Sequence, residues 1–247
     1  MITKTVKKLL RRLGVDLVKW TSGYQLVRFP GVGEDLSPLE LIVPHLAATS
    51  DFYFVQIGAN NGVRNDPLRS LILQYHLRGL LVEPLADMFA DLEKNYASES
   101  QLAFENAAIA KENGDLALYR FPADAKIPDW AHGNATFNQE ILQEKGRMVG
   151  VNQFEKVLVP CLTFQALKDK HHFEKVSLLQ VDTEGFDFEV IKMAIKSGVL
   201  PTLINYEFMH LSPQDRLDSC QLLADHGYSF IHGRWDTLAV RREELVI

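Results

Sequence analysis

The sequence predicts an α/β fold built on a mostly parallel β-sheet with helices on both faces. From Phe52 onward, short apolar runs alternate with segments whose apolar residues recur at helical spacing. The 247 residues are 47% hydrophobic and 23% charged, which is typical of a globular protein with a large core. The last two apolar runs, Tyr228–His232 and Thr237–Val240, are joined by a short turn and predict a closing antiparallel hairpin.

Residues 1–48 differ from the rest and are predicted to form a lead-in to a domain of residues 49–247. Met1–Trp20 carries apolar residues at three- and four-residue spacing and six basic residues against one acidic residue, which predicts a basic amphipathic helix. Residues 21–50 are expected to be mostly irregular, with a short helix near Pro38 to Ala48. The predicted helix of Met1–Trp20 either lies on an anionic membrane surface or packs on the domain or on a dimer partner, and both interpretations stay open.

Composition narrows the class of protein. A net charge of −6 gives no support for whole-surface nucleic-acid binding. Two cysteines in no metal spacing indicate a reducing compartment without disulfides, and no run of 18 apolar residues occurs. We therefore expect a cytoplasmic protein, with peripheral contact at the inner face of the membrane through residues 1–20 as the alternative location.

The sequence of the first half of the domain predicts four strands and two helices. Asp66 is expected to cap a helix that begins at Pro67, and Asn113-Gly114 is a hairpin-turn dipeptide. A second helix carries apolar residues from Leu85 to Leu92. The expected strands are Tyr53–Ile57, Leu80–Glu83, Ala103–Ala110 and Asp115–Phe121.

Residues 122–154 show no clear periodicity, and long connections in compact domains tend to be functional. The segment Trp130–Phe137 mixes aromatic and hydrogen-bonding side chains, which suits a polyhydroxylated or amphipathic substrate. The candidate substrate-binding residues are His132, Asn134 and Thr136. An Ω-loop packed on its own aromatic residues is the alternative.

Regular structure resumes after this segment. Thr163 and Ser212 are candidate helix caps, and Gly198 and Gly227 are candidate helix ends. The helices are expected from Thr163 to about Lys170, around Phe188 to Ile195, and after Ser212-Pro213. The expected strands are Val157–Leu162, Ser177–Val181 and Leu203–Tyr206.

The ends of the first two strands carry groups that fit a bound cofactor. The strand Tyr53–Ile57 runs into a turn containing Gly58, Asn60 and Gly62, where the chain can pass close to a ligand. The G-x-x-x-G spacing lacks the middle glycine of a dinucleotide fingerprint, which favours a ligand without phosphates such as S-adenosylmethionine. Glu83 ends the second strand, where a carboxylate can accept both hydroxyl protons of a ribose. A carboxylate placed by the helix dipole is the alternative.

Acidic residues follow the strand Ser177–Val181. Asp182 and Glu184 are costly to bury unless paired or bound to a ligand, so they are candidates for orienting an acceptor; an acidic helix N-terminus is the alternative. Glu207 and His210 end the next strand, where His210 is a candidate general base. Oxygen and nitrogen ligands scattered over strand ends are a weak metal signal, and we expect no metal.

Together these motifs resemble the FkbM-type family of S-adenosylmethionine-dependent methyltransferases. The family's glycine turn, acid before proline, third strand end, D-x-E-G turn and final strand end appear in this order between residues 50 and 210. They are Gln56 to Gly62, Glu83-Pro84, Asn106-Ala107-Ala108, Asp182-Thr183-Glu184-Gly185 and Ile204-Asn205-Tyr206-Glu207. There are two departures, since Gln56 and Gln165 stand where the family carries acids.

The resemblance implies a Rossmann-like class I methyltransferase fold, to which residues 1–48 add an N-terminal helical extension. It implies S-adenosylmethionine as cofactor, and methyl transfer to a hydroxyl of a sugar, glycan or secondary metabolite. The alternatives are a cofactor-binding or scaffold module without catalysis, which Gln56 favours, and a nicotinamide-dependent oxidoreductase, which Asn60 disfavours. The expected cofactor-binding residues are Gln56, Gly58, Asn60, Gly62, Glu83, Asn106, Ala107 and Asp182; those expected at the acceptor are Asp182, Glu184 and His210 for catalysis, and Glu207 for binding.

Overall fold

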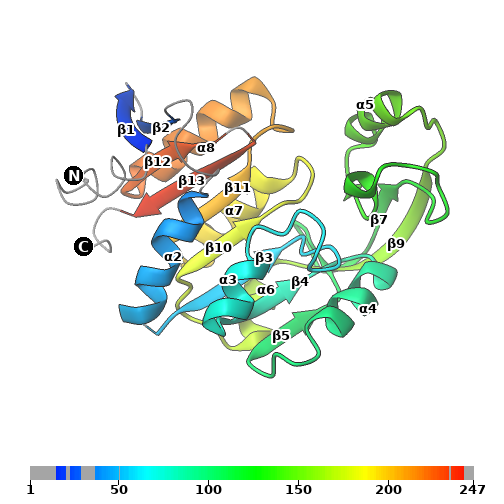
Figure 1. Ribbon diagram of the computed structural model, residues 1–247. Helices are drawn as coiled ribbons and strands as arrows, with labels where there is room; N and C mark the ends of the chain where they lie inside the picture. Colours follow the sequence, from blue (N-terminus) through cyan, green and yellow to red (C-terminus); the bar gives the residue numbers. More distant parts are fainter. Residues whose placement is uncertain (1–14, 21–22, 29–36, 50, 234, 242–247) are drawn as a thin grey trace.

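A computed structural model describes residues 15–20, 23–28, 37–49, 51–233 and 235–241 of the chain. Two sheets carry the fold (Figure 1). The main sheet has nine strands in the order β1-β2-β12-β13-β11-β10-β3-β4-β5. Their bounds are Val15–Trp20 (β1), Gly23–Arg28 (β2), Tyr228–His232 (β12), Asp236–Arg241 (β13), Leu203–Glu207 (β11), Leu178–Val181 (β10), Tyr53–Ile57 (β3), Arg78–Val82 (β4) and Leu102–Glu105 (β5).

The order of the central strands is that of the Rossmann-like class I methyltransferase fold, which confirms the expected fold class. Strands β11, β10, β3, β4 and β5 are parallel neighbours, and β13 runs antiparallel between β11 and β12. The strands β3, β4, β10 and β11 are almost fully buried on both faces, as parallel strands covered by helices require. The closing hairpin of β12 and β13 is also confirmed.

Helices cover both faces of this sheet. Phe54 turns toward the cluster beneath α2 and α3, while Val55 and Ile57 turn toward the cluster beneath α6, α7 and α8. This division follows from the alternation of side chains along a strand. The helices are Pro38–Thr49 (α2), Arg69–Tyr75 (α3), Ala86–Asn95 (α4), Phe164–His171 (α6), Asp187–Lys196 (α7) and Pro213–Asp225 (α8). Among the described helices, none combines the length and apolar character needed to cross a membrane.

A second, four-stranded sheet has the order β6-β9-β7-β8 and carries α5 (Figure 1). Figure 1 shows α5, β7 and β9 to one side of the main sheet. The elements are Ala108–Ile109 (β6), Gly114–Arg120 (β7), a 3₁₀ turn at Asp129–Ala131 (η1), Ala135–Thr136 (β8), Gln139–Val149 (α5) and Glu155–Leu162 (β9).

Four expectations from the sequence need correction. The expected strand Ala103–Ala110 breaks at Asn106-Ala107, and its two halves join different sheets. The strands flanking Asn113-Gly114 form no hairpin with each other, because β9 pairs with both β6 and β7. Asp66 accepts the Leu68 N–H at 2.8 Å as predicted for a cap, but the helix begins only at Arg69. Residues 122–154 contain the eleven-residue helix α5, capped by Asn138 and ended by Gly150.

The N-terminal expectation is wrong where it can be examined. Val15–Trp20 is a strand paired antiparallel with β2, so the expected helix does not extend to Trp20. Strand β2 in turn pairs with β12, which places part of the expected irregular segment in the main sheet. The expected short helix near Pro38 is present as α2. Residues 1–14, with most of the basic residues of the membrane hypothesis, lie outside the described part of the chain, and the division at residue 48 stays a prediction.

Candidate functional site

The glycine turn after β3 is built for close approach to the neighbouring strand end. Gly58, Asn60 and Gly62 all have left-handed backbone conformations, with φ of +82°, +48° and +69°. A Cβ atom on Gly58 would lie 1.8 Å from the carbonyl oxygen of Asp182. Glycine is therefore required here for the turns after β3 and β10 to meet. The turn from Gln56 to Gly62, together with Glu83, is called the glycine edge below.

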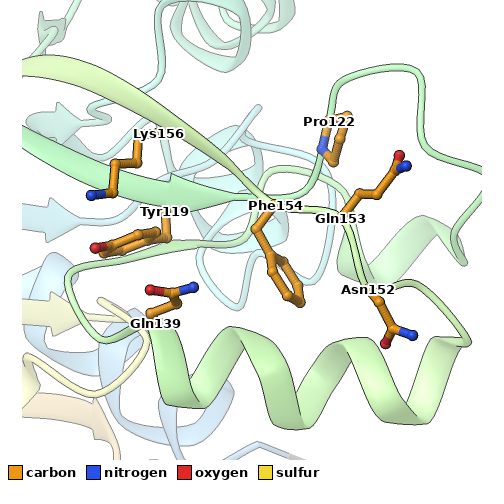
Figure 2. Close-up of a pocket in the computed structure, with 7 residues that line it drawn as sticks. All are labelled: Tyr119, Pro122, Gln139, Asn152, Gln153, Phe154 and Lys156. Carbon is orange, nitrogen blue, oxygen red and sulfur yellow. The ribbon is translucent and has the colours of Figure 1, made fainter.

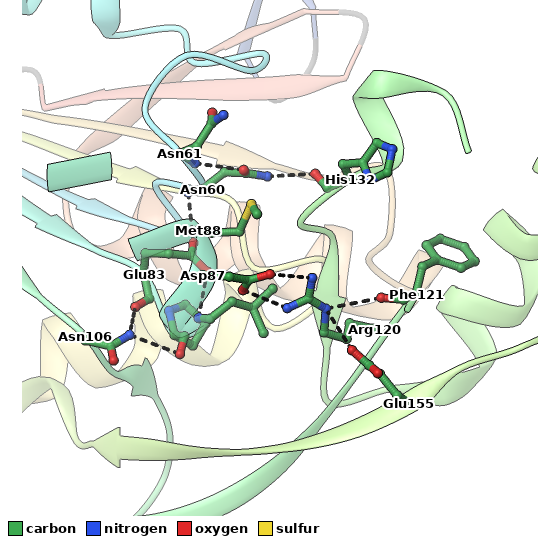
Figure 3. A network of polar contacts seen from close by, with 12 residues as sticks. Asn60, Asn61, Glu83, Asp87, Met88, Asn106, Arg120, Phe121, His132 and Glu155 are labelled. Atoms are coloured by element: carbon green, nitrogen blue, oxygen red, sulfur yellow. Dashed lines mark hydrogen bonds and ion pairs between the residues drawn. The ribbon is translucent and has the colours of Figure 1, made fainter. Parts of the chain in front are cut away.

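Glu83 lies directly after β4 and holds this turn through its side chain (Figure 3). One carboxylate oxygen accepts the Asn60 N–H at 2.8 Å, and the other accepts the Leu85 N–H at 2.9 Å. The side chain is only 3% exposed, and this burial raises its pKa to about 7. Each oxygen keeps a further lone pair, so the group fits a ligand that offers two hydroxyl donors, as a ribose does.

Asn106 contacts the backbone at Glu83, and Ala107 follows it in the chain. The Asn106 side-chain amide donates to the carbonyl oxygens of Glu83 and Pro84 at 2.8 and 3.1 Å (Figure 3). Ala107 is 1% exposed. The structure therefore gives Asn106 the position of a support for the Glu83 backbone, and direct cofactor contact by either residue stays a prediction.

Gln56 is buried where the FkbM resemblance expects an acid. Its amide nitrogen donates to Asp66 at 3.1 Å, and its buried carbonyl oxygen has no hydrogen-bond partner among the described residues. Asp66 also accepts from the Tyr96 hydroxyl at 3.1 Å, and burial raises the pKa of this aspartate. The orphaned Gln56 oxygen fits a ligand that brings a donor, such as the ammonium group of a methionine moiety.

Residues 108–162 form the second sheet and α5 and are called the inserted segment below. Polar contacts join this segment to the glycine edge and to α4. The Asn60 side chain donates to the carbonyl oxygen of His132 at 3.2 Å, and Arg120 makes a two-point ion pair with Asp87 of α4 at 2.7 and 2.8 Å (Figure 3). Arg120 also lies 3.4 Å from Glu155 of β9. The structure thus brings His132 to the predicted site through its backbone, and substrate contact by its side chain stays a prediction.

A second group of polar residues follows β10 and β11 and is called the acidic edge: Asp182, Glu184, Glu207 and His210. Glu184 is its central member. Its carboxylate accepts from Asn134 and forms an ion pair with Lys145, while its carbonyl oxygen accepts from the Thr136 hydroxyl at 2.8 Å. The predicted residues Asn134 and Thr136 are therefore brought to the predicted residue Glu184.

His210 lies beside the same carboxylate. Its Nε2 atom is 3.3 Å from Glu184 and 3.8 Å from Glu207, and it makes no hydrogen bond of acceptable geometry among the described residues. Burial lowers the pKa of His210, so the imidazole is uncharged at neutral pH. Burial also raises the pKa of Glu207, and Asp182 and Glu184 add to this shift. The neutral imidazole of His210, next to the uncharged carboxyl of Glu207, can accept a proton, which a general base requires.

Asp182 combines exposure with a crowded acidic surrounding. Desolvation by the surrounding protein raises the pKa of Asp182 well above its ordinary value, and the charges of Glu184 and Asp187 act in the same direction. The side chain is exposed to solvent, so water weakens the desolvation effect and leaves the neighbouring carboxylates as the main cause. Asp187 itself is fully buried and accepts from the Thr183 hydroxyl at 2.9 Å, so it holds the turn rather than facing a ligand.

Glu184, Glu207 and His210 have ligand atoms within 4.8 Å of one another, as a small metal site would. The Lys145 ammonium, however, already binds the Glu184 oxygen that faces His210. A divalent cation at this point would be repelled by that ammonium. The three residues therefore suit the Lys145 ammonium as their cation better than a metal ion.

Lys145 is the site residue that the sequence analysis missed. It lies on α5, is 7% exposed, and shares its buried helix face with Leu142. Asn138 and Gly150, which bracket this helix, were the local signals for it. Within this helix, Lys145 stands on the same face as the apolar Leu142, which was the signal for a buried ammonium paired with an acid.

A cavity of about 800 Å³ lies against α5 in the inserted segment (Figure 2). Figure 2 shows the rings of Tyr119 and Phe154 and the amide of Gln139 between the helix and the strands. Gln139 of this lining is adjacent to Asn138, whose N–H donates to the Thr136 hydroxyl that binds Glu184. The lining residues are Tyr119, Pro122, Gln139, Asn152, Gln153, Phe154 and Lys156.

The comparison with protein families decides the family. The model of the methyltransferase FkbM domain matches residues 56–230, which include both edges and the inserted segment. The chain belongs to this family. As an FkbM methyltransferase domain it uses S-adenosylmethionine. This agrees with the G-x-x-x-G spacing of the turn, which favours a ligand without phosphates, and with the Glu83 carboxylate.

Solved structures also resemble the FkbM domain chain at low identity. The O-methyltransferase of Bacillus cereus in complex with SAH is 9% identical, with 84% of this chain and 83% of that chain covered and a TM-score of 0.38. P. horikoshii TYW2 in complex with MeSAdo is 11% identical, with 92% and 70% covered and a TM-score of 0.37. The N-terminal domain of human METTL16 is 12% identical, with 96% and 79% covered and a TM-score of 0.39. No curated protein sequence matches the chain.

Proposed function

We propose that this FkbM methyltransferase transfers the methyl group to a hydroxyl of a polyhydroxylated acceptor, such as a sugar, a glycan or a secondary metabolite. The observation that carries the proposal is His210, an uncharged imidazole whose Nε2 atom has no hydrogen-bond partner among the described residues, at the end of β11. A hydroxyl acceptor must lose a proton during methyl transfer, and a neutral histidine can take it.

The cofactor supplies a methyl group on a positively charged sulfur, so the acceptor needs alignment more than activation. The glycine edge is suited to hold the cofactor, with Glu83 at the ribose and the Gln56 oxygen at a donor of the methionine part. The acidic edge is suited to hold the acceptor. There Asp182 is exposed and can accept hydrogen bonds from acceptor hydroxyls.

The cavity beside α5 supports a polyhydroxylated acceptor. Tyr119 and Phe154 offer ring faces, and Gln139, Asn152 and Gln153 offer amides that both donate and accept hydrogen bonds. Rings pack on the apolar faces of a sugar while amides bind its hydroxyls. The cavity is connected to Glu184 through the hydrogen bonds of Thr136 and Asn138.

Two other functions predicted from the sequence lack this support. A module without catalysis would have no use for an uncharged histidine beside a buried ion pair. A nicotinamide-dependent oxidoreductase would require a glycine at position 60, where Asn60 instead binds the His132 carbonyl oxygen.

Isothermal titration with S-adenosylmethionine and with NAD⁺ tests the cofactor, and methyl transfer to a panel of glycosides, amines and thiols tests the acceptor atom. We expect binding of S-adenosylmethionine alone and transfer to glycosides, unaffected by EDTA. The Glu83→Ala variant serves as the cofactor-site control. Transfer only to amines or thiols would contradict the hydroxyl acceptor, and binding without transfer to any acceptor would favour the non-catalytic module.

A further inference from the structure

Lys145 is a buried lysine that no motif of the strand ends accounts for. It is 7% exposed, and its ammonium contacts the Oε2 atom of Glu184. A lysine is rarely buried without a partner, because its charge must be compensated outside water. The helix that carries it, α5, belongs to the inserted segment and not to the strands that form the two edges.

Glu184 holds an unfavourable backbone conformation at the point where it meets this lysine. Its φ is +54°, in the left-handed region that glycine or asparagine adopts more easily. Such strain in a non-glycine residue persists where the side chain is needed. Here the Oε2 atom that Lys145 contacts also lies 3.3 Å from Nε2 of His210. One carboxylate oxygen therefore connects the lysine to the histidine.

We propose that Lys145 is a positioning residue for methyl transfer, which neutralises the Glu184 carboxylate and thereby keeps His210 uncharged and able to accept the acceptor's proton. This rests on the proposed function in one respect, the use of His210 as the base. An unpaired Glu184 carboxylate would instead stabilise a protonated imidazole, which cannot accept a proton. The inserted segment thus sets the charge state of the base.

Charged groups from α5, α8 and the turn after β10 act on His210. Burial comes first in lowering the pKa of this histidine, and Lys145 of α5 and Arg216 of α8 act in the same direction. Glu184 after β10 and Glu144 of α5 act in the opposite direction. Glu207 of β11 lies 3.8 Å away, but its raised pKa leaves it uncharged near neutral pH. Arg216 is committed to the carbonyl oxygens of Leu211 and Met209 at 3.1 and 2.6 Å.

The pKa of His210, measured by NMR titration of its ring protons in the full chain, tests the proposal without any acceptor. The Lys145→Met variant should raise this pKa by about one unit, and Lys145→Arg, which keeps the charge, should leave it nearly unchanged. Glu184→Gln should lower it. The resonance is assigned by its absence in His210→Gln, and circular dichroism checks that each variant is folded.

The double variant Lys145→Met/Glu184→Gln separates electrostatics from structure. Because the two charges act in opposite directions, the pKa of His210 should return toward the wild-type value in the double variant. This double variant also leaves no buried unpaired charge, so it remains informative if Lys145→Met alone does not fold. A pKa that is the same in every folded variant, or that moves in one direction in all of them, would overturn the proposal.

Kinetics then connect the pKa to catalysis. In Lys145→Met, the acid limb of the kcat/KM profile should move to higher pH by the same amount as the NMR pKa. The loss should approach about tenfold at pH values below both pKa values and disappear at higher pH. Loss of activity at all pH values without displacement of the limb would show a structural role only. If NMR gives the expected shifts and no hydroxyl acceptor is methylated, the proposed function fails while the coupling of Lys145 to His210 stands.

Discussion

The glycine edge and the acidic edge lie at the same ends of neighbouring strands, yet they are constructed differently. At the glycine edge, Glu83 binds backbone N–H groups of Asn60 and Leu85, so the edge is held by the two turns that form it. At the acidic edge, Glu184 binds side chains from outside the strand ends, Asn134 and Lys145 of the inserted segment. The first edge is therefore nearly complete in the Rossmann-like core, whereas the second depends on the insertion.

This difference separates the two tasks of a methyltransferase. The proposed function assigns the common cofactor to backbone geometry and one carboxylate, which a short motif specifies. It assigns the acceptor to side chains of the inserted segment, which can change without disturbing the sheet. Variants of each edge should therefore affect different measurements.

The largest effect is expected from His210→Ala at the acidic edge. Loss of a general base should lower kcat by about 10²–10⁴-fold while the affinity for S-adenosylmethionine is retained. Steady-state kinetics and calorimetry measure the two quantities. His226→Ala, which alters a histidine at the end of α8, is the matched control with unchanged kinetics. Normal turnover in His210→Ala would exclude this residue from the mechanism.

Gly58→Ala tests the point where the two edges touch. Alanine at φ of +82° is strained by about 1–2 kcal/mol, and contact of its Cβ with the Asp182 carbonyl oxygen adds about 1–3 kcal/mol. Urea unfolding should show the sum, and cofactor binding should be lost. Gly150→Ala, at φ of +75° with no atom near the added Cβ, should show only the backbone strain. Equal losses in the two variants would contradict the close approach.

The pH dependence of stability tests the burial of Glu83. Its pKa rises from 4.5 to about 7 on folding, so the folded state disfavours the ionised carboxylate. Below pH 4.5 the group is protonated in both states and there is no penalty. As the pH rises to 7 the unfolded state ionises first, so the protein loses stability relative to Glu83→Gln by at most about 3 kcal/mol. Denaturation of the cofactor-free protein at pH 5 and pH 8 measures this gap, and a constant gap would contradict it.

Glu83→Ala is expected to give the smallest effect on methyl transfer, because that effect acts through the affinity for the cofactor. Loss of hydrogen bonds to a charged group should weaken binding of S-adenosylmethionine by about 1.5–3 kcal/mol, as measured by calorimetry. Transfer at saturating cofactor should be largely retained, in contrast to His210→Ala. Unchanged affinity in a folded variant would remove Glu83 from the ribose site.

The sequence predicted most of the core because its signals are local. The strand Tyr53–Ile57 and the caps Thr163 and Ser212 are present as expected, since an apolar run or a capping side chain acts on its own neighbours. The same local signals failed for residues 103–110, where a segment expected to be one strand leaves the main sheet at Asn106. Which partner a strand finds is a question of long-range pairing, and periodicity does not contain that information.

The sequence by itself determined the α/β class, the glycine edge and the presence of acids after β10, because each depends on residues adjacent in the chain. Only the tertiary structure decided that Val15–Trp20 pairs as a strand, that β9 lies between β6 and β7, and that Lys145 reaches Glu184. These outcomes require segments distant in sequence to meet. Their energy comes from burial and charge pairing in the assembled fold, and no short stretch of sequence carries it.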